Sequence, residues 1–114
     1  MCYYYDISSI STDPISIIFN RQISGLQTND IANISSSSSS YWYWNGENCG
    51  FHKQLTADDV VKYISTSNTG NRIYVFVPND ITTINLFSWT NENGGKALIG
   101  EWPGSEMSKY INAQ

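Results

Sequence analysis

The feature that most limits the fold of this chain is a series of short aromatic and β-branched runs separated by polar turns. Residues of these types favour β-strands, and the Asn, Asp, Gly, Ser and Pro residues that bound the runs favour turns. Short strands joined in this way are typical of an antiparallel β-sandwich rather than of a parallel sheet with crossover helices. We predict strands at residues 3–10 (YYYDISSI), 15–19 (ISIIF), 41–45 (YWYWN), 73–77 (IYVFV), 84–89 (INLFSW) and, less strongly patterned, 96–99 (KALI).

One segment favours a helix instead. Thr56 is a suitable N-cap, and Asp58 and Asp59 carry the negative charge that stabilises a first turn. Apolar residues then recur at roughly helical spacing, namely Leu55, Val60, Val61 and Ile64. We predict two to three helical turns near residues 56–65, packed outside the sandwich. The serine run at 35–40 has no side chain worth burying, so we expect a mobile loop there.

Length and composition indicate one domain over residues 1–114. A chain of this length can bury a core without metals or several disulfides. Charged residues make up 14%, whereas Ser, Asn and Thr together supply 36 of the 114 residues, so solubility comes from neutral hydrogen-bonding groups. This composition is typical of a β-rich, secreted protein, although the first residues, MCYYYDISS, do not have the pattern of an export signal.

Charge and hydropathy exclude two classes of partner. Six Lys and Arg against ten Asp and Glu give a net charge of −4, which disfavours nucleic acid. No apolar run approaches the ~18 to 20 residues that span a bilayer, so no membrane association is expected.

Few residues are suited to metal binding or catalysis. Cys2 and Cys49 lack metal-ligand spacing, and they are either joined in a disulfide or present as two free thiols. The single histidine, His52, has no nucleophile in a suitable context, and Lys96 lacks the Ser or Thr that follows a P-loop lysine. Carboxylates lie scattered beside turns, at Asp30, Asp80, Glu92, Glu101 and Glu106. We therefore expect no catalytic residues, no cofactor and no metal, with calcium left open, and a binding protein rather than an enzyme.

The segment Trp-Pro-Gly-Ser-Glu-Met at residues 102–107 follows an aromatic strand and a Gly-rich turn. This WPGxxM signature resembles the starch-binding modules of carbohydrate-binding-module family 26, to which family 25 is related. The family order begins with a VYF-type strand, a strand of spaced aromatics ending in Trp, and the WPG turn with Met. An aromatic strand, an IIFN strand, a QTxD turn and a Tyr-rich strand follow. Residues 72–114 match the first half through Ile73-Tyr74-Val75-Phe76, Asn85-Leu86-Phe87-Ser88-Trp89 and the WPG segment.

The second half of the family pattern is also present, but it comes first in the chain. It consists of Tyr3-Tyr4-Tyr5, Ile17-Ile18-Phe19-Asn20, Gln27-Thr28-Asn29-Asp30 and Tyr41-Trp42-Tyr43-Trp44. Residues 1–46 thus resemble the family's C-terminal half, and residues 47–71 form a connector that includes the predicted helix. The resemblance implies an immunoglobulin-like antiparallel β-sandwich in circularly permuted order. The alternative is a cut from tandem modules, whose halves close on each other or swap between molecules.

The resemblance implies a non-catalytic module that binds α-glucan, meaning starch and maltooligosaccharides, outside the cell or at its surface. Aromatic rings would stack on the sugars while side-chain amides bind hydroxyls. The expected sugar-binding residues are Trp102, Phe87, Trp89, Asn85, Gln27 and Thr28. We expect a monomer, with a domain-swapped dimer as the alternative. The competing function is a β-sandwich adhesion or interaction module that binds protein or another glycan.

Some of these assignments have structural alternatives. Trp102 and Trp89 could be core residues, and Gln27 an ordinary turn residue. Asn85 and Phe87 depart from the family, which has tyrosines at both places on the strand. Packing roles are expected for Tyr3, Tyr5, Trp42, Trp44 and Tyr74, and exposure for Tyr4 and Tyr43.

Overall fold

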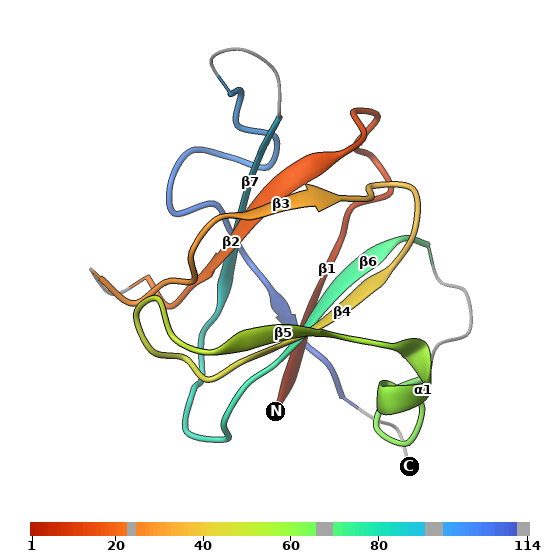
Figure 1. The fold of residues 1–114 in the computed structure, drawn as a ribbon, viewed down its shortest axis with the longest axis vertical. Coiled ribbons are helices and arrows are strands. Elements are labelled where there is room, and N and C mark those ends of the chain that lie inside the picture. Colours follow the sequence, from red (N-terminus) through yellow and green to blue (C-terminus); the bar gives the residue numbers. More distant parts are fainter. Residues whose placement is uncertain (23–24, 66–69, 91–94, 112–114) are drawn as a thin grey trace.

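Two β-sheets packed face to face make up the computed structural model, which describes residues 1–22, 25–65, 70–90 and 95–111 (Figure 1). The first sheet has the strand order β5-β4-β6-β1-β9, and the second has the order β3-β2-β7-β8. The strands are β1 (Cys2–Asp6), β2 (Ile15–Asn20), β3 (Ile31–Ile34), β4 (Ser40–Trp44), β5 (His52–Leu55), β6 (Arg72–Phe76), β7 (Asn85–Thr90), β8 (Ser105–Glu106) and β9 (Ser108–Lys109). Among the described strand pairs, β4 with β6 is the parallel one. The predicted all-β, two-sheet architecture is confirmed.

Strands were correctly predicted where the sequence is richest in aromatic and β-branched residues. β1, β2, β4, β6 and β7 occupy the five strongest runs, although β1 ends at Asp6 rather than at residue 10. The strand predicted at 96–99 is wrong. Ala97 makes only an isolated bridge with Trp89, and Leu98 N–H donates to the Ser88 carbonyl at 3.0 Å. The segment therefore follows the end of β7 too briefly to become a strand.

Other strands have no sequence signal of their own. β5 has the sequence HKQL and pairs with β4 from Tyr41 opposite Leu55 to Trp44 opposite His52. Pairing with an existing edge makes it a strand, because strand preference depends strongly on context. β3 likewise pairs with β2, with Ile31 opposite Ile17.

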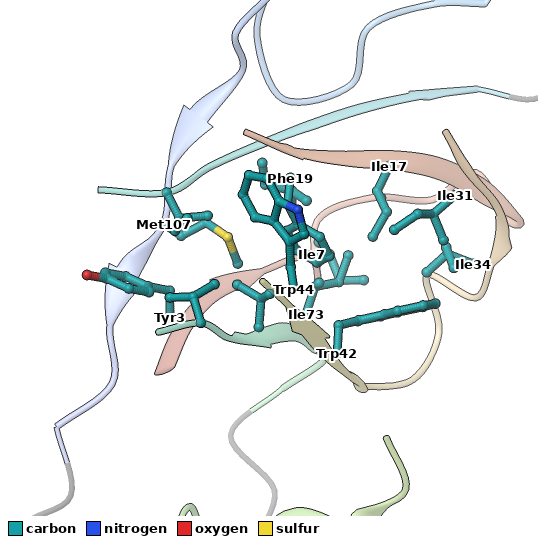
Figure 2. Packing of buried hydrophobic residues seen from close by; sticks show 14 of the residues in the cluster. Tyr3, Ile7, Ile17, Phe19, Ile31, Ile34, Trp42, Trp44, Ile73 and Met107 are labelled. Atoms are coloured by element: carbon teal, nitrogen blue, oxygen red, sulfur yellow. The ribbon is translucent and has the colours of Figure 1, made fainter. Parts of the chain in front are cut away.

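The core lies between the two sheets and receives large side chains from both (Figure 2). Trp44 and Phe19 are completely buried at its centre. Two of the buried aromatic residues show how their polar atoms are satisfied, as burial requires. Trp44 Nε1 donates to the Glu47 carbonyl at 3.1 Å, and Tyr3 Oη donates to the Ile81 carbonyl at 2.8 Å. The predicted packing roles of Tyr3, Trp42, Trp44 and Tyr74 are confirmed by their burial, and Tyr5 is half-buried.

The predicted helix is present but shorter than expected. α1 (Ala57–Val60) is a single turn with a capping box, in which Thr56 Oγ1 accepts from Asp59 N–H and an Asp59 carboxylate oxygen accepts from Thr56 N–H. Val60 and Ile64 pack on the outer face of the first sheet, whereas Val61 is exposed. Val60 and Ile64 are the two side chains that anchor this segment to the sheet, and the consecutive β-branched residues Val60 and Val61 disfavour a helix. A longer helix would therefore gain little stability.

The expectation of a loop free of its surroundings at residues 35–40 is wrong, and of the two alternatives for the cysteines the structure shows the free thiols. The serine run at 35–40 is tied to its surroundings rather than free: Ser36 is buried and its hydroxyl donates to the Thr12 carbonyl at 2.6 Å. Ser40 begins β4 and accepts from Trp42 Nε1 at 3.0 Å. Cys2 is buried and Cys49 is exposed, both as free thiols, so the disulfide alternative is excluded in this structure.

In both sheets, strands from the beginning of the chain are direct neighbours of strands from its end. β2 pairs with β7 along its whole length, from Ile15 opposite Thr90 to Asn20 opposite Asn85, and β1 pairs with β6. The two long strands β2 and β7 lie side by side in Figure 1. Residues 15–19 therefore pair with a strand of the region 73–89, far away in the sequence. Within the described ranges, no helix has the length and apolar character needed to cross a bilayer.

Candidate functional site

Three aromatic side chains meet on the outer face of the second sheet. Leu86 belongs to the core, so its neighbours on β7 point the other way, and Phe87 and Trp89 are half-buried on the outer face. Their ring centroids are 5.5 Å apart with planes at 30°. Trp102, from the segment between β7 and β8, meets Phe87 with a centroid distance of 5.3 Å and an interplanar angle of 72°.

The position of Trp102 depends on the glycine that follows it in the WPG segment. Gly104 has φ +90°, and a Cβ there would collide with the Leu86 carbonyl and approach the Phe87 Cα. Only glycine lets the segment lie directly on β7. A second tether comes from Asn20, whose side-chain amide donates to the Pro103 carbonyl at 3.0 Å. Trp102 is held in place while remaining 49% exposed, so it is not a core residue.

A groove of about 670 Å³ runs beside two of these rings. It is lined by Phe87, Trp89, Gly95, Lys96, Ala97 and Glu101. Lys96 and Glu101 are exposed, and they place an ammonium group and a carboxylate at the edge of the aromatic surface. Neither was among the expected sugar contacts. Their role depends on how residues 95–101 fold back against β7, which no local sequence signal indicates.

Two of the expected sugar contacts lie beneath the surface. Asn85 is 3% exposed, and its side-chain oxygen accepts from Gln22 Nε2. Thr28 is 0% exposed, and its hydroxyl oxygen accepts from Phe19 N–H at 3.1 Å. In this conformation both side chains support neighbouring backbone or side chains, and neither borders the groove.

Gln22 rather than Gln27 lies beside β7. Gln27 is half-buried, makes a bridge with Asn20 on the side of β2 away from β7, and its carbonyl accepts from Cys49 N–H at 2.7 Å. At ~4.8 Å per strand, this position is about 10 Å from β7. Gln22 is exposed and touches Asn85 on β7 itself. The sequence analysis missed Gln22, although a contact across 63 positions leaves no local signal.

This surface offers flat rings that can stack and polar side chains that can hydrogen-bond. In the part of the chain that is described, no three His, Cys, Asp or Glu side chains form a group suited to a metal ion. Comparisons with protein-family models, with curated proteins and with solved structures found no match. The geometry of the aromatic surface therefore carries the functional inference.

Proposed function

We propose that this domain is a non-catalytic carbohydrate-binding module that binds α-glucan chains on the surface formed by Phe87, Trp89 and Trp102. The observation that carries the proposal is the meeting of these rings at 5.3 and 5.5 Å on an outer sheet face. A glucose unit presents C–H groups on its faces and hydroxyls around its rim. Flat rings with few rotatable bonds bind such faces at a small entropic cost.

The angles between the rings favour an α-glucan over a flat polysaccharide. An extended β-1,4-linked chain is ribbon-like, and rings that lie in one plane suit it best. An α-1,4-linked chain curves, so successive glucose units change direction. Phe87 and Trp89 are inclined by 30°, whereas Trp102 is turned by 72° from Phe87. A surface bent in this way is complementary to a curved chain.

Polar groups at the edge of the groove complement the stacking. The Lys96 ammonium can donate to hydroxyl oxygens and the Glu101 carboxylate can accept from hydroxyls, at the rim of the same groove as Trp89. Because the surface is small and open, affinity for a maltooligosaccharide should fall in the micromolar to millimolar range, about 4 to 8 kcal/mol.

The proposal includes an immunoglobulin-like sandwich in circularly permuted order, acting as a monomer outside the cell or at its surface. The pairing of β2 with β7 and of β1 with β6 supports it, because residues 1–46 and 72–114 then share both sheets. The connector adds β5 at one edge and packs Val60 over the outer face of the first sheet. Neighbouring strands of a sandwich need proximity in space rather than in sequence, so a rotated order is compatible with this arrangement.

Retention on insoluble polysaccharides tests the function directly. The parent protein should be retained on granular starch and released by soluble maltoheptaose, and it should pass through cellulose and chitin. Retention on cellulose in place of starch would assign the surface to another glycan. Passage through all three, with no heat on addition of maltoheptaose in calorimetry, would refute the proposal and favour a protein-binding module.

A further inference from the structure

A polar pocket lies at the beginning of β7, at the opposite end of that strand from Trp89. It has a volume of about 310 Å³ and is lined by Arg21, Gln22, Thr82 and Thr83. These side chains supply two hydroxyls, a carboxamide and a guanidinium group. Such a set offers both donors and acceptors to a ligand rich in hydroxyls.

Gln22 joins this pocket to the sheet. Its side-chain amide donates to Asn85 Oδ1, and its backbone N–H donates to Asn20 Oδ1 at 3.0 Å. Asn20 and Asn85 are opposite each other in the β2–β7 register. Gln22 also has φ 62°, a left-handed conformation that is unfavourable for a residue with a side chain. The two asparagines thus hold the side chain of Gln22, an exposed residue, at this place.

The pocket and the aromatic rings lie in one row along β7. Leu86 and Ser88 are buried, so the alternating β7 residues Asn85, Phe87 and Trp89 face the other way, and Thr83, just before the strand, lines the pocket. The Gln22 side chain lies against Asn85 in the middle of the row. Asn85 itself stays buried there. The six steps from Thr83 to Trp89, at ~3.3 Å each, make the row at most about 20 Å long. One glucan of several units can therefore contact its two ends.

We propose that the pocket is a further glucose-binding subsite and that Gln22 is its specificity-determining residue. The inference rests on the proposed function of the aromatic surface. One glucose unit of a longer chain enters the pocket, where the exposed Gln22 amide and the Thr83 hydroxyl bind its hydroxyls, while Phe87, Trp89 and Trp102 stack on other units. Arg21 borders the pocket with its guanidinium Nη1 donating to the Gly46 carbonyl at 3.4 Å.

A series of maltooligosaccharide lengths tests this assignment by calorimetry. The parent protein should bind maltoheptaose about tenfold more tightly than maltotriose, because only the longer chain reaches the pocket. Gln22→Gly removes the amide and suits the left-handed backbone, so this variant should lose most of the tenfold gain. Its affinity for maltotriose should stay within about twofold of the parent value. Thr83→Val should lose part of the gain.

Two comparisons separate the pocket from other causes. Gln54→Ala removes an exposed glutamine from β5 in the other sheet and should keep the full gain with length. Gln27→Ala should also keep it, because Gln27 lies on the far side of β2. Thermal unfolding checks that each variant is folded, and an unfolded Gln22→Gly protein is replaced by Gln22→Asn, which shortens the amide but also tolerates the backbone.

The outcomes distinguish this inference from the proposed function. A parent protein that binds no maltooligosaccharide would refute both. A parent that binds maltotriose and maltoheptaose equally, or a folded Gln22 variant that keeps the tenfold gain, would refute the subsite while leaving the aromatic surface as the binding site.

Discussion

Phe87 and Trp102 meet edge to face, with ring centroids 5.3 Å apart, although one lies on β7 and the other on the segment that leads back to β8. An edge-to-face pair is favourable in itself, because the positive edge of one ring meets the negative face of the other. The contact therefore supports Trp102 from one side and leaves the rest of its indole exposed. That exposed part is the largest flat apolar surface of the site.

Replacing Trp102 with alanine should weaken binding to maltoheptaose by about 2 kcal/mol or more, as expected for an aromatic anchor. Calorimetry measures the loss. Because Trp102 is 49% exposed, the fold should survive, and thermal unfolding checks this.

Phe51→Ala is the matched control for Trp102→Ala. Phe51 is 60% exposed and packs against Tyr43 of the first sheet, with ring centroids 6.1 Å apart. Its loss removes a comparable aromatic surface from the other side of the sandwich, so binding should be unchanged. If Phe51→Ala weakens binding and a folded Trp102→Ala does not, the site is on the first sheet.

Phe87→Tyr should bind maltoheptaose at least as tightly as the parent, with a gain of up to about 1 kcal/mol from one added hydrogen bond. Phe87 is half-buried at the edge of the groove, so a hydroxyl on its ring has room to reach a sugar. Phe87→Leu serves as the comparison, because it removes the flat ring and should weaken binding. A tyrosine variant that binds worse than the leucine variant would show that Phe87 does not face the sugar.

Local sequence was sufficient for the strongly patterned parts of this protein. Runs such as ISIIF and IYVFV could be assigned as strands because each residue type favours that conformation. β5 could not, since HKQL becomes a strand only through its pairing with β4. Thr56 was identified as an N-cap from residue type alone, whereas the length of α1 depended on how many side chains reach the sheet.

The aromatic part of the candidate site could be predicted from the sequence, because the residue type alone identifies a ring that can stack. Trp102, Phe87 and Trp89 were identified as aromatic candidates, and the structure brings them together. The polar partners could not be chosen from sequence. Whether Asn85 is open or covered depends on Gln22, which reaches it through the register of β2 against β7.

Gly104→Ala should reduce both stability and glucan binding. Gly104 has φ +90°, and an added Cβ would collide with the backbone of Leu86, so the segment bearing Trp102 must move away from β7. Left-handed strain alone costs about 1 to 2 kcal/mol, and the collision adds to it. Chemical denaturation and calorimetry with maltoheptaose measure the two effects.

The matched control for Gly104→Ala is Gly25→Ala. Gly25 has φ +81°, and a Cβ there would meet nothing within 4 Å. This variant should show the strain without the collision, hence a smaller loss of stability and unchanged binding. Equal effects of the two variants on binding would contradict the role of Gly104 in placing Trp102.

The last prediction concerns alkaline pH. Burial raises the pKa of the Cys2 thiol from its ordinary value of 9.0 to about 12. Between these values the unfolded chain loses the thiol proton and the folded chain keeps it, so the free energy of unfolding falls as pH rises. The contribution of Cys2 is fully present below pH 9 and is lost by pH 12, a loss of at most about 4 kcal/mol. Cys2→Ala should therefore show a shallower decline than the parent in denaturation curves across this range, whereas Cys49→Ala, which removes an exposed thiol, should follow the parent. Parallel declines in the parent and in Cys2→Ala would mean that the thiol ionises equally well in the folded protein.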